Sequence, residues 1–114
     1  MNITYEWVSE DQRVKALVDQ WCSQDFVTID TEFVRTRTFY PQVGLLQVAD
    51  NQGVYLIDPL ALTDLSPLTH LLEDPTTIKV LHSGSEDAEI FHYFFKAHSR
   101  AVFDSQIGAG VLGL

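Results

Sequence analysis

The segment Phe26-Val27-Thr28-Ile29-Asp30-Thr31-Glu32-Phe33 has the alternating pattern of a β-strand inside a sheet. Successive side chains of a strand point to opposite faces, so Asp30 and Glu32 project from one face. They are about 7 Å apart along a strand that rises ~3.3 Å per residue. The residues before them are apolar enough to be buried. An Asp-x-Glu pair is by itself a weak signal, because a solvent-facing pair at a strand end is common.

The sequence before this strand predicts a strand at 4–8 and then a helix. Ser9 is expected to cap that helix, with Gln12 as its capping-box partner, and the helix is expected to end near Ser23. Its apolar face recurs at helical spacing. The residues of this face are Val14, Leu17, Val18 and Trp21.

The sequence after this strand predicts the rest of an α/β domain. Strands are expected at 43–50, 54–58, 78–82 and 101–103, and helices at 65–73, 83–98 and from 105 onward. Asn51-Gln52-Gly53 joins two of the strands and is a hairpin signal. An antiparallel meander followed by βα units implies a mixed sheet of five or six strands with helices on both faces.

The composition is that of one globular domain. The chain has 114 residues, of which 46% are hydrophobic. No run approaches the ~20 apolar residues of a membrane helix, and no signal-peptide pattern is present, so we expect a cytoplasmic protein without membrane contact. A single cysteine, Cys22, excludes an internal disulfide and fits a reducing compartment. The net charge of −9 disfavours unaided binding to a polyanion, unless acids gather around cations.

A third carboxylate, Asp87, begins the predicted helix at 83–98. The apolar stripe of this helix is formed by Ile90, Phe91 and Phe94, and helical spacing extends it back to Asp87. Acids favour the first turn of a helix, but this preference does not explain an inward position, since a buried carboxylate protonates or finds a cation. We therefore expect Asp30, Glu32 and Asp87 to face inward and to bind a hard divalent ion, Mg²⁺ or Mn²⁺. No set of thiolates and histidines indicates zinc.

Six segments, taken in this order, resemble a known family. They are FVTIDTEF at 26–33, VRTRTFYP at 34–41, GLLQ at 44–47, HSGSED at 82–87, EIF at 89–91 and FDSQI at 103–107. Together they are similar to ribonuclease D of the DEDD 3′-to-5′ exonuclease superfamily, and the resemblance covers nearly the whole chain from Tyr5. The segment 26–33 looks like the first exonuclease motif, and 82–87 with 89–91 looks like the second.

This resemblance implies a ribonuclease H-like fold and a 3′-to-5′ exoribonuclease that uses two divalent cations, Mg²⁺ or Mn²⁺. Asp30 would bridge the two ions, Glu32 would help hold the ion that activates water, and Asp87 would support the second ion. The implied substrate is the 3′ end of single-stranded RNA, as in the trimming of tRNA precursors, and DNA is less expected.

The family's third motif has a Tyr or a His followed four residues later by a final Asp and lies well downstream of the second motif, and we expect no such pair anywhere in this chain. We therefore expect residues 1–114 to be the N-terminal part of a single exonuclease domain, without the third motif and any C-terminal helical domains. Such a fragment is expected to have little or no activity alone. Apolar residues at 107–114 predict possible self-association.

Several residues around the three acids are candidates for contact with substrate, although each is also explained as a loop or core residue. They are Thr31, Phe33, Arg35, Arg37, Gln47 and His82. Two other functions are compatible with parts of the sequence. A non-catalytic module could use the same fold to bind nucleic acid or protein, and a glycosidase could use two of the carboxylates without a metal.

Overall fold

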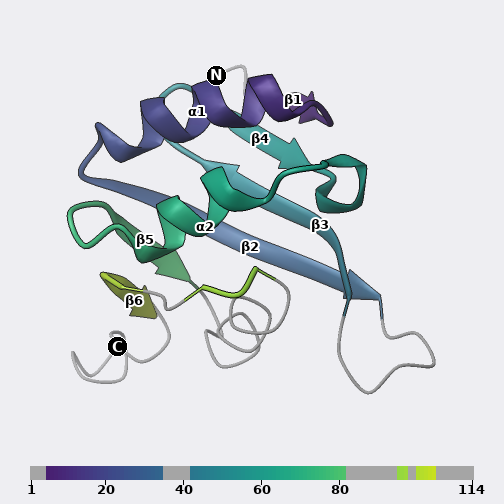
Figure 1. Cartoon of the computed structure of the whole chain (residues 1–114). Helices are drawn as coiled ribbons and strands as arrows, with labels where there is room; N and C mark the ends of the chain where they lie inside the picture. Colours follow the sequence, from purple (N-terminus) through teal and green to yellow (C-terminus); the bar gives the residue numbers. More distant parts are fainter. Residues whose placement is uncertain (1–4, 35–41, 82–94, 98–99, 105–114) are drawn as a thin grey trace.

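The computed structural model describes residues 5–34, 42–81, 95–97 and 100–104. Within these residues the chain forms a six-stranded sheet in the order β1-β4-β3-β2-β5-β6, over which two helices lie (Figure 1). The strands are β1 (Tyr5–Val8), β2 (Phe26–Val34), β3 (Gln42–Ala49), β4 (Val54–Ile57), β5 (Ile78–Leu81) and β6 (Val102–Asp104). The helices are α1 (Asp11–Cys22) and α2 (Ser66–Glu73), and a short 3₁₀ helix, η1 (Pro59–Ala61), follows β4.

The sheet is mixed, and β2 lies between an antiparallel neighbour, β3, and a parallel neighbour, β5. β2 pairs with β3 and β3 with β4 in antiparallel fashion, whereas β2–β5, β5–β6 and β1–β4 are parallel pairs. The predicted mixed sheet is therefore confirmed, and each predicted strand is present with ends that differ by one residue at most.

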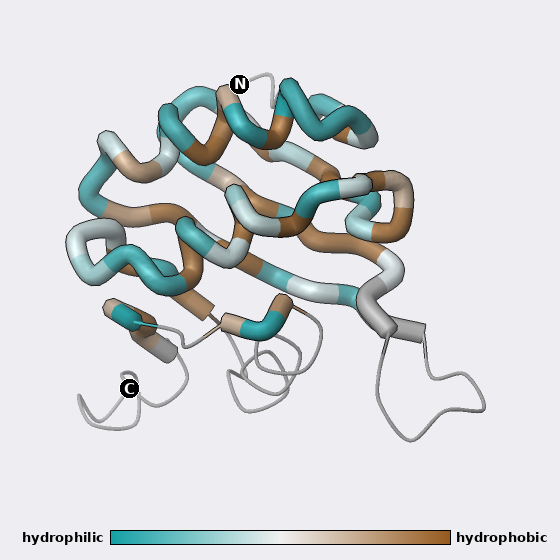
Figure 2. The backbone as a smooth tube through the Cα atoms, viewed as in Figure 1, coloured by the Kyte–Doolittle hydropathy of each residue, from teal (hydrophilic) through white to brown (hydrophobic). Residues whose placement is uncertain are grey.

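Helices α1 and α2 cover one face of the sheet and form the core with it. The predicted apolar residues of α1, from Val14 to Trp21, are all buried. Hydrophilic and hydrophobic residues recur along this helix (Figure 2), as expected for an element with one face on the core. On the sheet, Val27 and Ile29 of β2 belong to the same core, because strand alternation directs their side chains toward the helices.

The opposite face of the sheet carries large exposed apolar side chains. Trp7 is 60% exposed, Phe26 56% and Phe103 49%. Most of the helix predicted for 83–98 and the whole of the helix predicted from 105 onward lie outside the described residues. None of the helices that the structure describes has the length and apolar character needed to cross a bilayer.

Two local predictions are wrong. The N-cap of α1 is Glu10, without a side-chain capping bond, so the capping box expected at Ser9 is not formed. Instead, Asp11 accepts hydrogen bonds from the backbone N–H groups of Thr63 and Asp64, which ties the start of α1 to the turn before α2. The helix expected to continue to about His98 does not include 95–97, where Lys96 has a left-handed φ of 55°.

Asp50 organises the β3–β4 hairpin that the sequence predicts. Its Oδ1 accepts the backbone N–H groups of Gln52 at 2.8 Å and Gly53 at 3.0 Å. Its Oδ2 accepts the side-chain amides of Gln20 at 2.7 Å and Gln24 at 3.2 Å. Burial raises the pKa of Asp50, but these hydrogen bonds outweigh burial and lower the pKa overall. The carboxylate therefore joins the hairpin to the end of α1.

We expect Asp50→Ala to lower the free energy of unfolding by about 1–2 kcal/mol at neutral pH, because it removes several hydrogen bonds to a partly buried charge. Urea unfolding followed by circular dichroism measures this loss. Since the folded pKa is lowered, the contribution is present above the usual carboxyl pKa of about 4 and is lost as pH falls through the lowered pKa. The free energies of unfolding of the wild type and of Asp50→Ala should therefore become equal in acid. The matched change at exposed Asp25, Asp25→Ala, should cost less than ~0.5 kcal/mol, and an equal loss there would contradict the prediction.

Candidate active site

Asp30 and Glu32 lie on β2, in the interior of the strand order. Alternation places them on the face opposite Val27 and Ile29, and therefore away from α1 and α2. Both acids are exposed, so the expectation that they face the interior is wrong for these two positions. The prediction that they share one face of a strand is confirmed.

The neighbouring strand places an amide beside the acids. Gln47 of β3 pairs with Asp30, and Leu45 pairs with Glu32, so these side chains share the same face. Gln47 is exposed. The register of β2 and β3 shifts between Glu32 and Phe33, and such a bulge bends a strand and re-aims its side chains. The face thus presents two carboxylates and an amide, all with oxygen atoms of the kind that hard divalent cations bind.

The other predicted site residues are placed only in part. Thr31 is half-buried, and alternation puts it on the face of β2 that the helices cover. Phe33 belongs to β2, and the structure describes its backbone pairing with Val43. Outside the described residues lie Arg35, Arg37, His82 and Asp87. The structure therefore brings together Asp30, Glu32 and Gln47, and does not test the place of Asp87.

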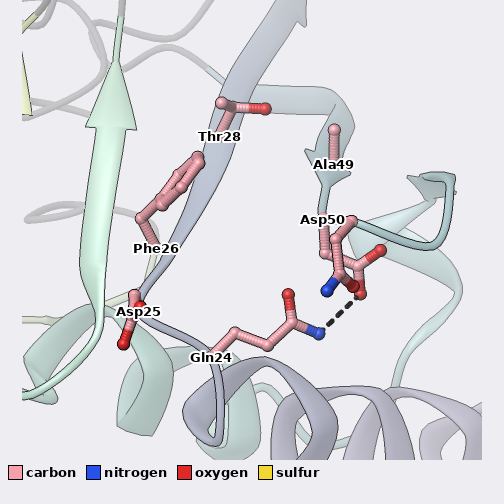
Figure 3. A pocket seen from close by; sticks show the side chains of 7 residues that line it. Gln24, Asp25, Phe26, Thr28, Ala49 and Asp50 are labelled. Atoms are coloured by element: carbon pink, nitrogen blue, oxygen red, sulfur yellow. Dashed lines mark hydrogen bonds between the residues drawn. The ribbon is translucent and has the colours of Figure 1, made fainter.

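A pocket of about 260 Å³ opens where β2 begins and β3 ends (Figure 3). Its lining consists of Gln24, Asp25, Phe26, Thr28, Ala49, Asp50 and Asn51. Thr28 is two positions before Asp30 on the same face, so the pocket lies along the strand from the two acids. The Asp50 carboxylate at its rim is held by Gln24, as the dashed line in Figure 3 marks. This carboxylate is already used by the hairpin, so the pocket is not a good candidate for a metal site.

One cluster was missed by the sequence analysis. Cys22, His70 and Asp74 place one ligand atom each within 4.8 Å of one another. His70 and Asp74 have the His-x-x-x-Asp spacing, so the expectation that no such pair occurs in the chain is wrong. They precede Asp87 in the chain and belong to the helical layer, on the other side of the sheet from Asp30, so they do not complete the predicted catalytic set.

Solved structures define the class of fold. The crystal structure of Escherichia coli RNase D superposes on the whole of this chain and on 30% of its own length, with a TM-score of 0.88 and 42% sequence identity. The catalytic core of RRP6 from Trypanosoma brucei gives a TM-score of 0.90 at 18% identity, with 99% of this chain and 32% of that one covered. The second likeness shows the fold alone. The mixed sheet is thus that of the ribonuclease H-like exonucleases, as expected.

Sequence relatives define the family. Residues 5–114 match the family model described as 3′-5′ exonuclease, and the chain belongs to this family. Ribonuclease D of Shewanella sp. (strain ANA-3) is 44% identical over 110 residues, which are 96% of this chain and 28% of that protein. Ribonuclease D of Escherichia coli (strain K12) is 42% identical over 111 residues, which are 97% of this chain and 30% of that protein. The chain therefore spans less than a third of the length of these relatives, and the resemblance to ribonuclease D is confirmed.

Proposed function

We propose that the protein hydrolyses the 3′-terminal phosphodiester bonds of RNA with two divalent cations, Mg²⁺ or Mn²⁺, held by Asp30, Glu32 and Asp87. The observation that carries this proposal is the pair of exposed carboxylates on one face of β2, in a chain 42% identical to an exoribonuclease. Trimming of tRNA precursors and a cytoplasmic location are parts of the same proposal.

The residues present fit such cations. Asp30 and Glu32 offer up to four carboxylate oxygens on an exposed face, and the Gln47 amide lies next to Asp30. Both acids are on one strand, which fixes the spacing between them better than a loop would. When bound, two cations supply an activated water and stabilise the charge on the leaving oxygen. The carboxylates would hold the cations and orient the activated water, so the proposal requires no covalent nucleophile.

The charge of the chain bears on how RNA is held. A net charge of −9 repels the phosphate backbone, and cations at the paired acids would offset this repulsion locally. Arg35 and Arg37 are proposed to contact phosphate beside the site. Since the relatives are more than three times as long as the matched segment, further RNA contacts are proposed to come from parts of the protein beyond it.

We further propose that residues 1–114 form the N-terminal part of one exonuclease domain and have little or no activity alone. The test replaces the matched segment of Escherichia coli ribonuclease D by this chain and compares the chimera with the chain alone. A 5′-labelled RNA should be shortened from its 3′ end by the chimera in Mg²⁺ or Mn²⁺ and should stay intact in EDTA. The chain alone should leave it intact under all three conditions.

Two results would contradict these proposals. Metal-dependent trimming by the chain alone would show that its site is complete. A chimera that folds, as judged by circular dichroism, and yet cleaves neither RNA nor matched DNA would favour the non-catalytic binding module.

A further inference from the structure

The ends of the two helices bring together three side chains that the proposed nuclease function does not use. Cys22 is the last residue of α1, His70 lies in the last turn of α2, and Asp74 is the C-cap of α2. Both helices lie on the same side of the sheet (Figure 1), and strand alternation places Asp30 and Glu32 on the opposite side. The cluster is therefore separate from the candidate active site.

Local hydrogen bonds hold the side chain of Asp74 and the backbone of Cys22. Thr76 donates to Asp74 Oδ1 from its backbone N–H at 2.8 Å and from its hydroxyl at 2.6 Å. The Cys22 thiol lies beside the Asp74 carboxylate, with its sulfur within 4.8 Å of a carboxylate oxygen. The Thr77 hydroxyl donates to the Cys22 carbonyl oxygen at 3.3 Å. His70 is exposed, whereas Cys22 and Asp74 are half-buried.

We propose that Cys22, His70 and Asp74 bind one transition-metal ion of the zinc class, with water as the fourth ligand. The three ligand atoms lie within 4.8 Å of one another. Tetrahedral zinc needs them roughly 3.3–3.8 Å apart, from bond lengths of about 2.0–2.3 Å. Rotation of the exposed His70 side chain, together with small shifts of Cys22 and Asp74, would supply the contraction. His70 and Asp74 are four residues apart, a spacing that puts two side chains on one side of a helix.

The donor set distinguishes this ion from the ions of a nuclease site. A thiolate and an imidazole favour zinc, whereas Mg²⁺ prefers oxygen atoms only. A thiolate and a carboxylate together neutralise a divalent ion. The ion would replace the proton of the Cys22 thiol, and would connect the C-terminal ends of α1 and α2.

The surroundings of the thiol predict how binding depends on pH. Burial, with help from the Asp74 carboxylate, raises the pKa of Cys22 to about 11. The thiol is therefore protonated near neutral pH, and metal binding must release this proton. Three charged groups face the thiol: Asp74 and Asp19 raise its pKa, while buried Lys79, which donates to the Asp74 backbone carbonyl, lowers it. Binding should accordingly strengthen as pH rises.

The test is a Co²⁺ titration of the reduced 114-residue chain without an affinity tag, because Co²⁺ reports thiolate ligation by a charge-transfer band. The chain has one cysteine, so any such band belongs to Cys22. We expect a band that saturates at one equivalent, disappears on adding Zn²⁺ and resists millimolar Mg²⁺. Cys22→Ser should abolish the band, and His70→Ala or Asp74→Asn should each weaken Co²⁺ binding at least ~10-fold.

Two matched variants serve as controls. Asp64→Asn changes the carboxylate that accepts the Ser66 N–H at the other end of α2, and Asp30→Asn changes the candidate active site. Neither should alter the titration, so the result does not depend on nuclease activity. Zn²⁺ should also raise the melting temperature of the wild-type chain and not that of His70→Ala, whose exposed side chain can be removed without opening the core. No band with reduced wild-type protein, or an affinity unchanged in both His70→Ala and Asp74→Asn, would overturn the proposal.

Discussion

Replacing Asp30 by asparagine in the chimera is expected to lower the rate of RNA trimming by about 10³-fold or more. The amide keeps the size of the side chain and removes the charge that would hold a divalent cation. A bound cation contributes several kcal/mol to the transition state, and each ~1.4 kcal/mol corresponds to a tenfold change in rate. Single-turnover trimming of a 5′-labelled RNA in Mg²⁺ measures the effect. Circular dichroism should be unchanged, because Asp30 is exposed.

The position of Asp30 on its strand provides a matched control. Asp25 is exposed and directly precedes β2, so Asp25→Asn removes the same charge several residues away from the acid pair. This variant should trim RNA at the wild-type rate, whereas Glu32→Gln should be impaired like Asp30→Asn. If both Asp30→Asn and Glu32→Gln retained full metal-dependent activity, the pair would not be the catalytic one.

Local patterns in the sequence were sufficient for most of the described fold. The spacing of Val14, Leu17, Val18 and Trp21 predicts α1 and its buried face, and the structure buries all four. The Asn51-Gln52-Gly53 signal predicts the β3–β4 hairpin, which Asp50 then holds through two backbone N–H groups. These predictions succeed because each pattern is decided by neighbours in sequence.

The burial of the candidate site could not be predicted in the same way. Alternation shows that Asp30 and Glu32 share a face, but not which face α1 and α2 cover, because that depends on how distant segments pack. Likewise, Cys22 and His70 are far apart in sequence, and only the packing of α1 against α2 brings them together. The capping box at Ser9 failed for a related reason, since Asp11 is engaged by the distant Thr63.

Trp21→Ala is expected to have the largest effect on stability among the substitutions considered. The Trp21 side chain is 0% exposed. Its ring meets that of Tyr55 edge-on, with centroids 5.5 Å apart and planes at 65°. Removing a buried aromatic ring leaves a cavity between α1 and the sheet and costs about 3–5 kcal/mol. The melting temperature should therefore fall by at least ~12 °C. Urea unfolding followed by far-ultraviolet circular dichroism is the suitable measurement, because the variant loses one of only two tryptophans.

Two further variants separate the cavity from other causes. Trp21→Phe retains a ring against Tyr55 and removes an indole N–H that is buried without a hydrogen-bond partner among the described residues. Trp21→Phe should therefore lower the free energy of unfolding by no more than about half as much as Trp21→Ala does. Trp7→Ala makes the same substitution at a side chain that is 60% exposed and should change stability by less than ~0.5 kcal/mol. Equal losses at positions 7 and 21 would mean that the face of the sheet opposite α1 and α2 stabilises the fold as much as the face beneath them. The exposed fractions, 0% for Trp21 and 60% for Trp7, argue against that outcome.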